Sequence, residues 1–97
     1  MGYAPKIVLQ LPLSSPDLLP PFVEACIRDG VALIAIVGDG CGEIEEMIDE
    51  LIVGDGSDKS RFSVSTTSHP GEAIDEVMEF ASVFDAKGGQ AIELVRL

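Results

Sequence analysis

Two residues of the chain have the types and positions that nucleophilic catalysis needs. Cys41 follows a glycine-studded turn and opens a segment with helical spacing of apolar residues, and a helix N-terminus favours the thiolate form of cysteine. His69, the single histidine, lies on a later loop. A thiolate with a base within hydrogen-bond reach is the arrangement for covalent catalysis. Cys41 and His69 are therefore candidate catalytic residues, but Asp39 and Glu43 would disfavour the thiolate, so the favoured interpretation is that Cys41 is a turn residue and His69 caps a helix.

The turn from Gly38 to Gly42 has the composition of a phosphate-binding loop but not its spacing. Its glycines follow G-x-G-x-G, whereas dinucleotide folds use G-x-G-x-x-G. Asp39 and Glu43 have the wrong sign for an anion, so a tight turn is the favoured interpretation. We expect no cofactor and no metal, because the aspartates are too scattered for a calcium loop and one histidine with two cysteines does not indicate structural zinc.

The chain is organised around the apolar segment Val31–Val37. A run without a polar residue is typical of a strand that is covered on both faces, as in parallel sheets. Other strands are expected at 6–11, 61–67 and 91–97. Helices are expected from about residue 20 to 29, from 41 to 53, and in a third segment that His69–Glu72 opens and Lys87–Gly89 closes.

This β-α-β-α-β-α-β order predicts a single α/β domain over residues 1–97. We expect a three-layer α/β/α sandwich with a four-stranded, mainly parallel sheet in the flavodoxin-like order 2-1-3-4. Ligands of such sheets bind beyond the carboxyl ends of the strands, where the strand order reverses. That point would lie between the first and third strands. The candidate ligand-binding residues there are Ser14, Ser15, Asp39, Gly40 and Ser68.

Charge is the strongest functional signal in the sequence. The net charge is −11, from 17 acids and 6 bases, which excludes nucleic acid and anionic membranes as partners. Residues 39–58 contain eight acids and no base. We expect the third helix to add its acids on the same side of the sheet. The candidate partner-binding residues are Glu43, Glu46, Asp49, Glu50, Asp75, Glu76 and Glu79.

Two segments, VGDGSD at residues 53–58 and TTSHPGEAIDEVMEFA at residues 66–81, resemble those of small uncharacterised bacterial α/β proteins. The resemblance covers the second half of the chain and implies a bacterial source but no activity. We see no signal peptide and no apolar run of about 18 residues that could span a membrane. A cytoplasmic location with reduced thiols is therefore expected.

These observations favour a small protein-binding or regulatory module, of the inhibitor or immunity type, that docks a basic partner through its acidic helical face. A solvated helix surface is the alternative interpretation of that face. A second functional hypothesis is a small enzyme or ligand binder at the carboxyl edge of the sheet, using Cys41 and His69. A third is a homodimer that pairs through the strand at 91–97.

Overall fold

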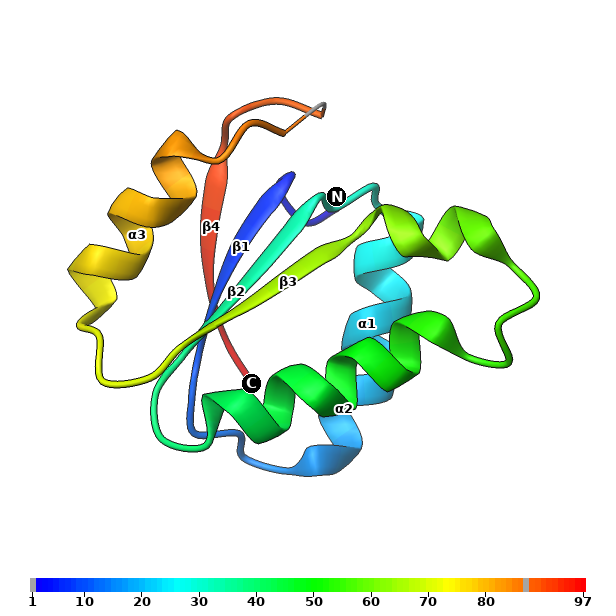
Figure 1. The fold of residues 1–97 in the computed structure, drawn as a ribbon, viewed down its shortest axis with the longest axis horizontal. Coiled ribbons are helices and arrows are strands. Elements are labelled where there is room, and N and C mark those ends of the chain that lie inside the picture. The colour runs from blue at the N-terminus through cyan, green and yellow to red at the C-terminus, as the bar shows by residue number, and fades with distance from the viewer. Residues whose placement is uncertain (1, 87) are drawn as a thin grey trace.

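A computed structural model describes residues 2–86 and 88–97, so Lys87, which we expected to close the third helix, lies outside the described residues. The chain forms a four-stranded parallel sheet with three helices (Figure 1). The strands are β1 (Lys6–Gln10), β2 (Leu33–Val37), β3 (Ser65–His69) and β4 (Ile92–Arg96). The helices are α1 (Leu19–Arg28), α2 (Cys41–Val53) and α3 (Ile74–Val83), with short 3-10 helices η1 (Pro16–Leu18) and η2 (Lys59–Ser63).

The strands are ordered β3-β2-β1-β4, and every neighbouring pair is parallel. The parallel α/β sheet is confirmed, but the predicted order 2-1-3-4 is wrong. That order would have left β2 at an edge, with the backbone groups along one side of the strand unpaired. All five residues of β2 are buried, and the strand pairs with β1 on one side and β3 on the other. The serine- and threonine-rich β3 takes that edge instead, and β4 forms the other edge.

Each face of the sheet has its own apolar core. One core joins β1 and β2 to α1 and α2, and it includes Ile34, Phe22 and Ile48. The other core joins the opposite face of the same strands to α3, and it includes Val8, Ala35 and Val77. Figure 1 shows α3 on the other side of the sheet from α1 and α2. The prediction that α2 and α3 share one side is therefore wrong.

Local turns account for the remaining differences from the predicted elements. The span of α2 is as predicted, but β3 begins at Ser65 because the residues before it form η2. The side chain of Asp58 starts η2 by accepting a hydrogen bond from the backbone N–H of Ser60 at 3.1 Å. Helix α3 begins at Ile74, after a turn in which Gly71 has φ +73°. His69 consequently ends a strand and does not cap a helix.

The turn between β2 and α2 is tight, as expected. Gly38 has φ +119°, and a Cβ added there would lie 3.0 Å from the Cβ of Leu11. Gly40 has φ +81° and forms the N-cap of α2. Both conformations favour glycine, because a side chain is strained at positive φ. Within residues 2–86 and 88–97, no helix has both the length and the apolar composition that a membrane span needs.

Candidate functional site

The structure does not bring Cys41 and His69 together. Cys41 is 2% exposed and belongs to the core beneath α1 and α2. The imidazole of His69 packs on the other face of the sheet, with its ring centroid 4.7 Å from that of Phe80 in α3. Because a whole strand layer separates the two side chains, they do not form the thiolate–base pair that the sequence suggested.

The imidazole of His69 lies between a hydroxyl and a carboxylate. Its Nε2 is 2.8 Å from Thr67 Oγ1, and its Nδ1 is 3.0 Å from Glu72 Oε2. Thr67 lies two residues earlier on the same face of β3, and Glu72 lies on the turn before α3. With His69 only 6% exposed, the three side chains fix the end of β3 to the start of α3. The i, i+2 spacing of Thr67 and His69 was the sequence signal for this contact.

The reversal of strand order lies between β1 and β4, and not between the first and third strands as predicted. The C-terminal residues of the chain make hydrogen bonds across this point of reversal. The backbone N–H and the hydroxyl of Ser14 both donate to the carbonyl of Leu97, at 3.1 and 2.8 Å. Arg96 Nε donates to Gln10 Oε1 at 2.8 Å. Ser14 therefore has a structural role in joining the loop after β1 to the chain end.

The other candidate ligand-binding residues are dispersed along the carboxyl edge of the sheet. Ser15 accepts a hydrogen bond from the N–H of Asp17 and caps η1. Ser68 lies half-buried on β3. Asp39 and Gly40 line a shallow cavity of about 330 Å³, together with Glu43 and apolar residues of the loop after β1. The two carboxylates make this cavity unsuitable for an anion.

The exposed face of α2 carries carboxylates that the described bases leave uncompensated. Glu43, Glu46, Asp49 and Glu50 are exposed. Glu45 is half-buried, and it accepts a hydrogen bond from the hydroxyl of Thr66, as does Asp49. The salt bridges among the described residues join Arg28 to Asp29, Arg61 to Glu24 and His69 to Glu72, and none involves α2.

The predicted partner-binding residues of α3 form a separate surface. Asp75, Glu76 and Glu79 are exposed, but α3 covers the face of the sheet opposite α2. Glu76 also has a local role, because its carboxylate accepts the N–H of Ala73 at the helix start. The single acidic face that the sequence suggested is therefore two faces.

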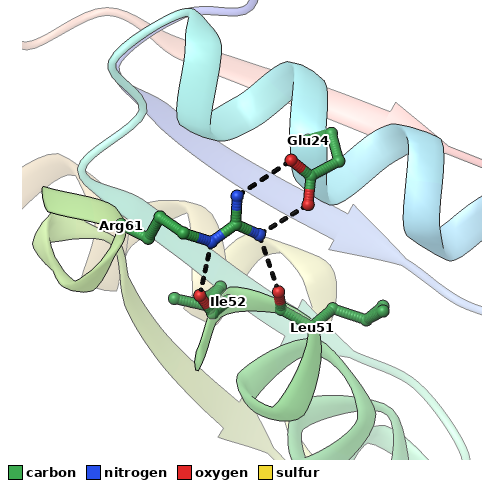
Figure 2. Close-up of polar contacts among 4 residues, drawn as sticks. All are labelled: Glu24, Leu51, Ile52 and Arg61. Atoms are coloured by element: carbon green, nitrogen blue, oxygen red, sulfur yellow. Dashed lines mark hydrogen bonds and ion pairs between the residues drawn. The ribbon is translucent and has the colours of Figure 1, made fainter. Parts of the chain in front are cut away.

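Sequence reasoning missed Arg61, which connects three elements (Figure 2). Its guanidinium donates to both carboxylate oxygens of Glu24 on α1. It also donates to the carbonyls of Leu51 and Ile52 at the end of α2, at 2.8 and 2.9 Å. This contact raises the pKa of Arg61 and lowers the pKa of Glu24, chiefly through the hydrogen bonds between their side chains. Arg61 thereby fixes the spacing of α1 and α2 on the acidic side of the molecule.

Between these two helices lies an open groove of about 750 Å³. Leu19 forms its buried floor. Met47 and Val53, which are 39% and 45% exposed, belong to its wall, and Asp49 and Glu50 supply carboxylates. Met47 recurs at helical spacing with the buried Ile48 and Ile52, yet its side chain is exposed at this groove. The groove arises from the crossing of two helices and has no signature in either sequence segment.

Within the described residues, no group of three or more histidine, cysteine, aspartate or glutamate side chains could hold a metal ion. Asp55 and Asp58, two of the scattered aspartates, each accept hydrogen bonds from a nearby serine. Asp55 Oδ1 accepts from the N–H and hydroxyl of Ser57, and Asp58 Oδ1 accepts in the same way from Ser60.

Comparison with known proteins identifies a family but no relative of known activity. No curated protein matches the chain, and no solved structure matches it. A family model described as "Domain of unknown function (DUF7684)" matches residues 7–96. The match extends well beyond the second half of the chain, to which our resemblance was limited. The chain therefore belongs to the DUF7684 family.

Proposed function

We propose that the chain is a protein-binding module that docks a basic partner through the carboxylates of α2, in the manner of an inhibitor or immunity-type protein. The observation that carries this proposal is the uncompensated charge of Glu43, Glu46, Asp49 and Glu50, all exposed on one helix. Like charges spaced i, i+4 destabilise a helix by about 0.2–0.5 kcal/mol per pair. The Glu46–Glu50 pair therefore has a cost in helix stability, whereas a one-sided field speeds encounter with a cationic protein.

The structure offers a matched pair of variants for testing this proposal. Glu46→Lys with Glu50→Lys changes the net charge by the same amount as Asp75→Lys with Glu79→Lys, but on the opposite side of the sheet. The immobilised protein is used to capture partners from cell extract, and each captured protein is purified and its affinity measured at several salt concentrations. We expect a partner of high pI whose affinity falls steeply with salt and drops at least about tenfold for the α2 pair.

The α3 pair is the control, and it should retain most of the affinity of the wild type. Equal losses for the two pairs would mean that only total charge matters. Binding that does not depend on salt, or a partner of low pI, would contradict the proposal.

A second candidate function, an acyl-transfer enzyme, is favoured by the Thr67–His69–Glu72 contacts. A hydroxyl, an imidazole and a carboxylate in this order are the nucleophile, base and orienting group of covalent catalysis. Against it, the imidazole is 6% exposed. Hydrolysis of p-nitrophenyl acetate that is abolished by Thr67→Val would favour the enzyme; a rate equal to that of free imidazole would remove it.

A further inference from the structure

The groove between α1 and α2 is mainly apolar and adjoins the acidic face of α2. Its exposed apolar side chains, Met47 and Val53, belong to the same helix as the carboxylates of Glu46 and Glu50. Isolated exposed apolar residues are ordinary on protein surfaces. Here they line a groove of about 750 Å³ whose floor is Leu19, so a partner could bury several apolar side chains in one place.

We propose that this groove receives the apolar face of a basic amphipathic helix that belongs to the partner. The inference rests on the proposed function, and it adds the form of the segment that binds. A helix laid in a groove between two helices presents apolar residues at i, i+3, i+4 and i+7 to the groove. Lysine or arginine residues on the flanks of the same helix would then lie beside the carboxylates of α2.

Charge complementarity selects this occupant over the alternatives. A second copy of the chain also carries a net charge of −11, so pairing two such surfaces would bring like charges together, which costs free energy. An apolar small molecule is a poorer fit, because the groove is open and ligand pockets bury most of the surface of a ligand. Methionine, which adapts its shape, suits a surface that receives helical side chains.

The experiment uses three synthetic peptides of about 18 residues as probes, a length at which helices begin to form in water. The first has lysine on one helical face and leucine on the other. The second has the same lysines with glutamine in place of leucine, and the third has the leucines with glutamate in place of lysine. Affinity for the full chain is measured by fluorescence anisotropy at about 150 mM salt.

We expect the leucine–lysine peptide to bind at least about tenfold more tightly than the glutamine–lysine peptide, because only the first has an apolar face to bury. Met47→Ser with Val53→Ser should remove most of that difference and leave the weak binding of the glutamine–lysine peptide unchanged. The control is Val83→Ser on α3, because Val83 is 78% exposed but lies on the opposite side of the sheet from the groove.

Each other outcome identifies which proposal fails. Equal affinity of the two lysine peptides would overturn the groove inference and leave the proposed docking of a basic partner intact. Absence of binding by both lysine peptides would contradict both. Tight binding of the leucine–glutamate peptide would overturn the basic character of the occupant, and dimerisation that Met47→Ser abolishes in sedimentation would assign the groove to a second copy.

Discussion

The carboxylate of Glu24 and the guanidinium of Arg61 form a bidentate contact between α1 and η2, the short helix that follows α2 (Figure 2). The remaining donors of Arg61 reach the carbonyls of Leu51 and Ile52. These oxygens lie in the last turn of α2, where no helical N–H is available to them. One arginine thus caps α2 and joins it to α1, and the two helices that form the groove are held by the same side chain.

Loss of this contact should destabilise the protein and widen the groove. We expect Arg61→Met to lower the free energy of unfolding by more than Glu24→Gln does, because the arginine variant also leaves two helix-end carbonyls without a donor. Urea denaturation of both variants at pH 7 measures the difference. Arg61→Lys should recover little of the stability that Arg61→Met loses, since an ammonium does not reproduce the fork geometry of a guanidinium.

The same pair has a defined pH dependence. The contact with Arg61 lowers the pKa of Glu24 from its ordinary value of 4.5. The contribution of the ionised carboxylate to the free energy of unfolding is therefore fully present above pH 4.5 and is lost as the pH falls through the lowered pKa. The stability difference between the wild type and Arg61→Met should therefore shrink in acid. A difference that is the same at pH 7 and pH 3 would mean that the carboxylate contributes nothing.

Charge reversal on α2 should separate stability from binding. Glu50→Lys places a lysine four residues after Glu46 and near the negative end of the helix dipole. We expect it to raise the free energy of unfolding by about 0.5 kcal/mol while weakening the proposed docking. Glu79→Lys, four residues after Asp75, is the matched control and should give a similar stability gain without a loss of binding. Chemical denaturation and the peptide affinities test the two parts separately.

The sequence predicted the elements of the fold better than their arrangement. The unbroken apolar segment around Ile34 correctly indicated a strand covered on both faces. The order of the strands depends on which pairs meet in space, and a pattern along the chain does not specify it. The error in order then displaced the predicted ligand site, because the point of reversal moves with the order.

Side-chain contacts between distant segments were the second feature that could not be predicted from the sequence. Arg61 belongs to the segment that the sequence predicts as a strand at 61–67, yet it hydrogen-bonds to α1 and α2. Lys6 begins the predicted strand at 6–11, and nothing in the sequence indicates that its side chain is completely buried. His69 was a candidate partner of Cys41, but the alternation of side chains along β3 directs it to the other face of the sheet.

The buried Lys6 supports a clear prediction about packing. Its Nζ donates to the carbonyl of Ala81, in the last turn of α3, at 2.7 Å. That carbonyl also accepts the N–H of Phe84, so it keeps a partner when the lysine is removed. Lys6→Met should change the free energy of unfolding by less than about 1.5 kcal/mol. Lys6→Ala should cost about 2–5 kcal/mol, because it leaves a cavity under α3. Urea denaturation of both variants is the test. A loss for Lys6→Met as large as that for Lys6→Ala would show that the charge of Lys6, and not its packing, stabilises the fold.

Neither thiol should react in the folded protein. Cys26 is fully buried, and burial, followed by the charges of Asp29 and Glu93, raises its pKa to about 12. Cys41 is 2% exposed. We expect iodoacetamide at pH 8 to modify both thiols at least about 100-fold more slowly than in urea, since reaction requires exposure and the thiolate. Mass spectrometry locates the adducts; rapid modification of native Cys41 would revive a catalytic role for that residue.

The contacts of His69 should control the start of α3. His69→Phe retains a ring against Phe80 but removes the hydrogen bonds to Thr67 and Glu72, and we expect it to lower the free energy of unfolding by about 1–3 kcal/mol. Glu72→Gln, which can still accept a hydrogen bond from the ring, should cost less. Amide hydrogen exchange should rise first in the turn that leads into Ile74, because that segment is fixed to β3 through the imidazole. Exchange that rises equally throughout the sheet would contradict this prediction. It would show that His69 stabilises the whole core and not only the turn before α3.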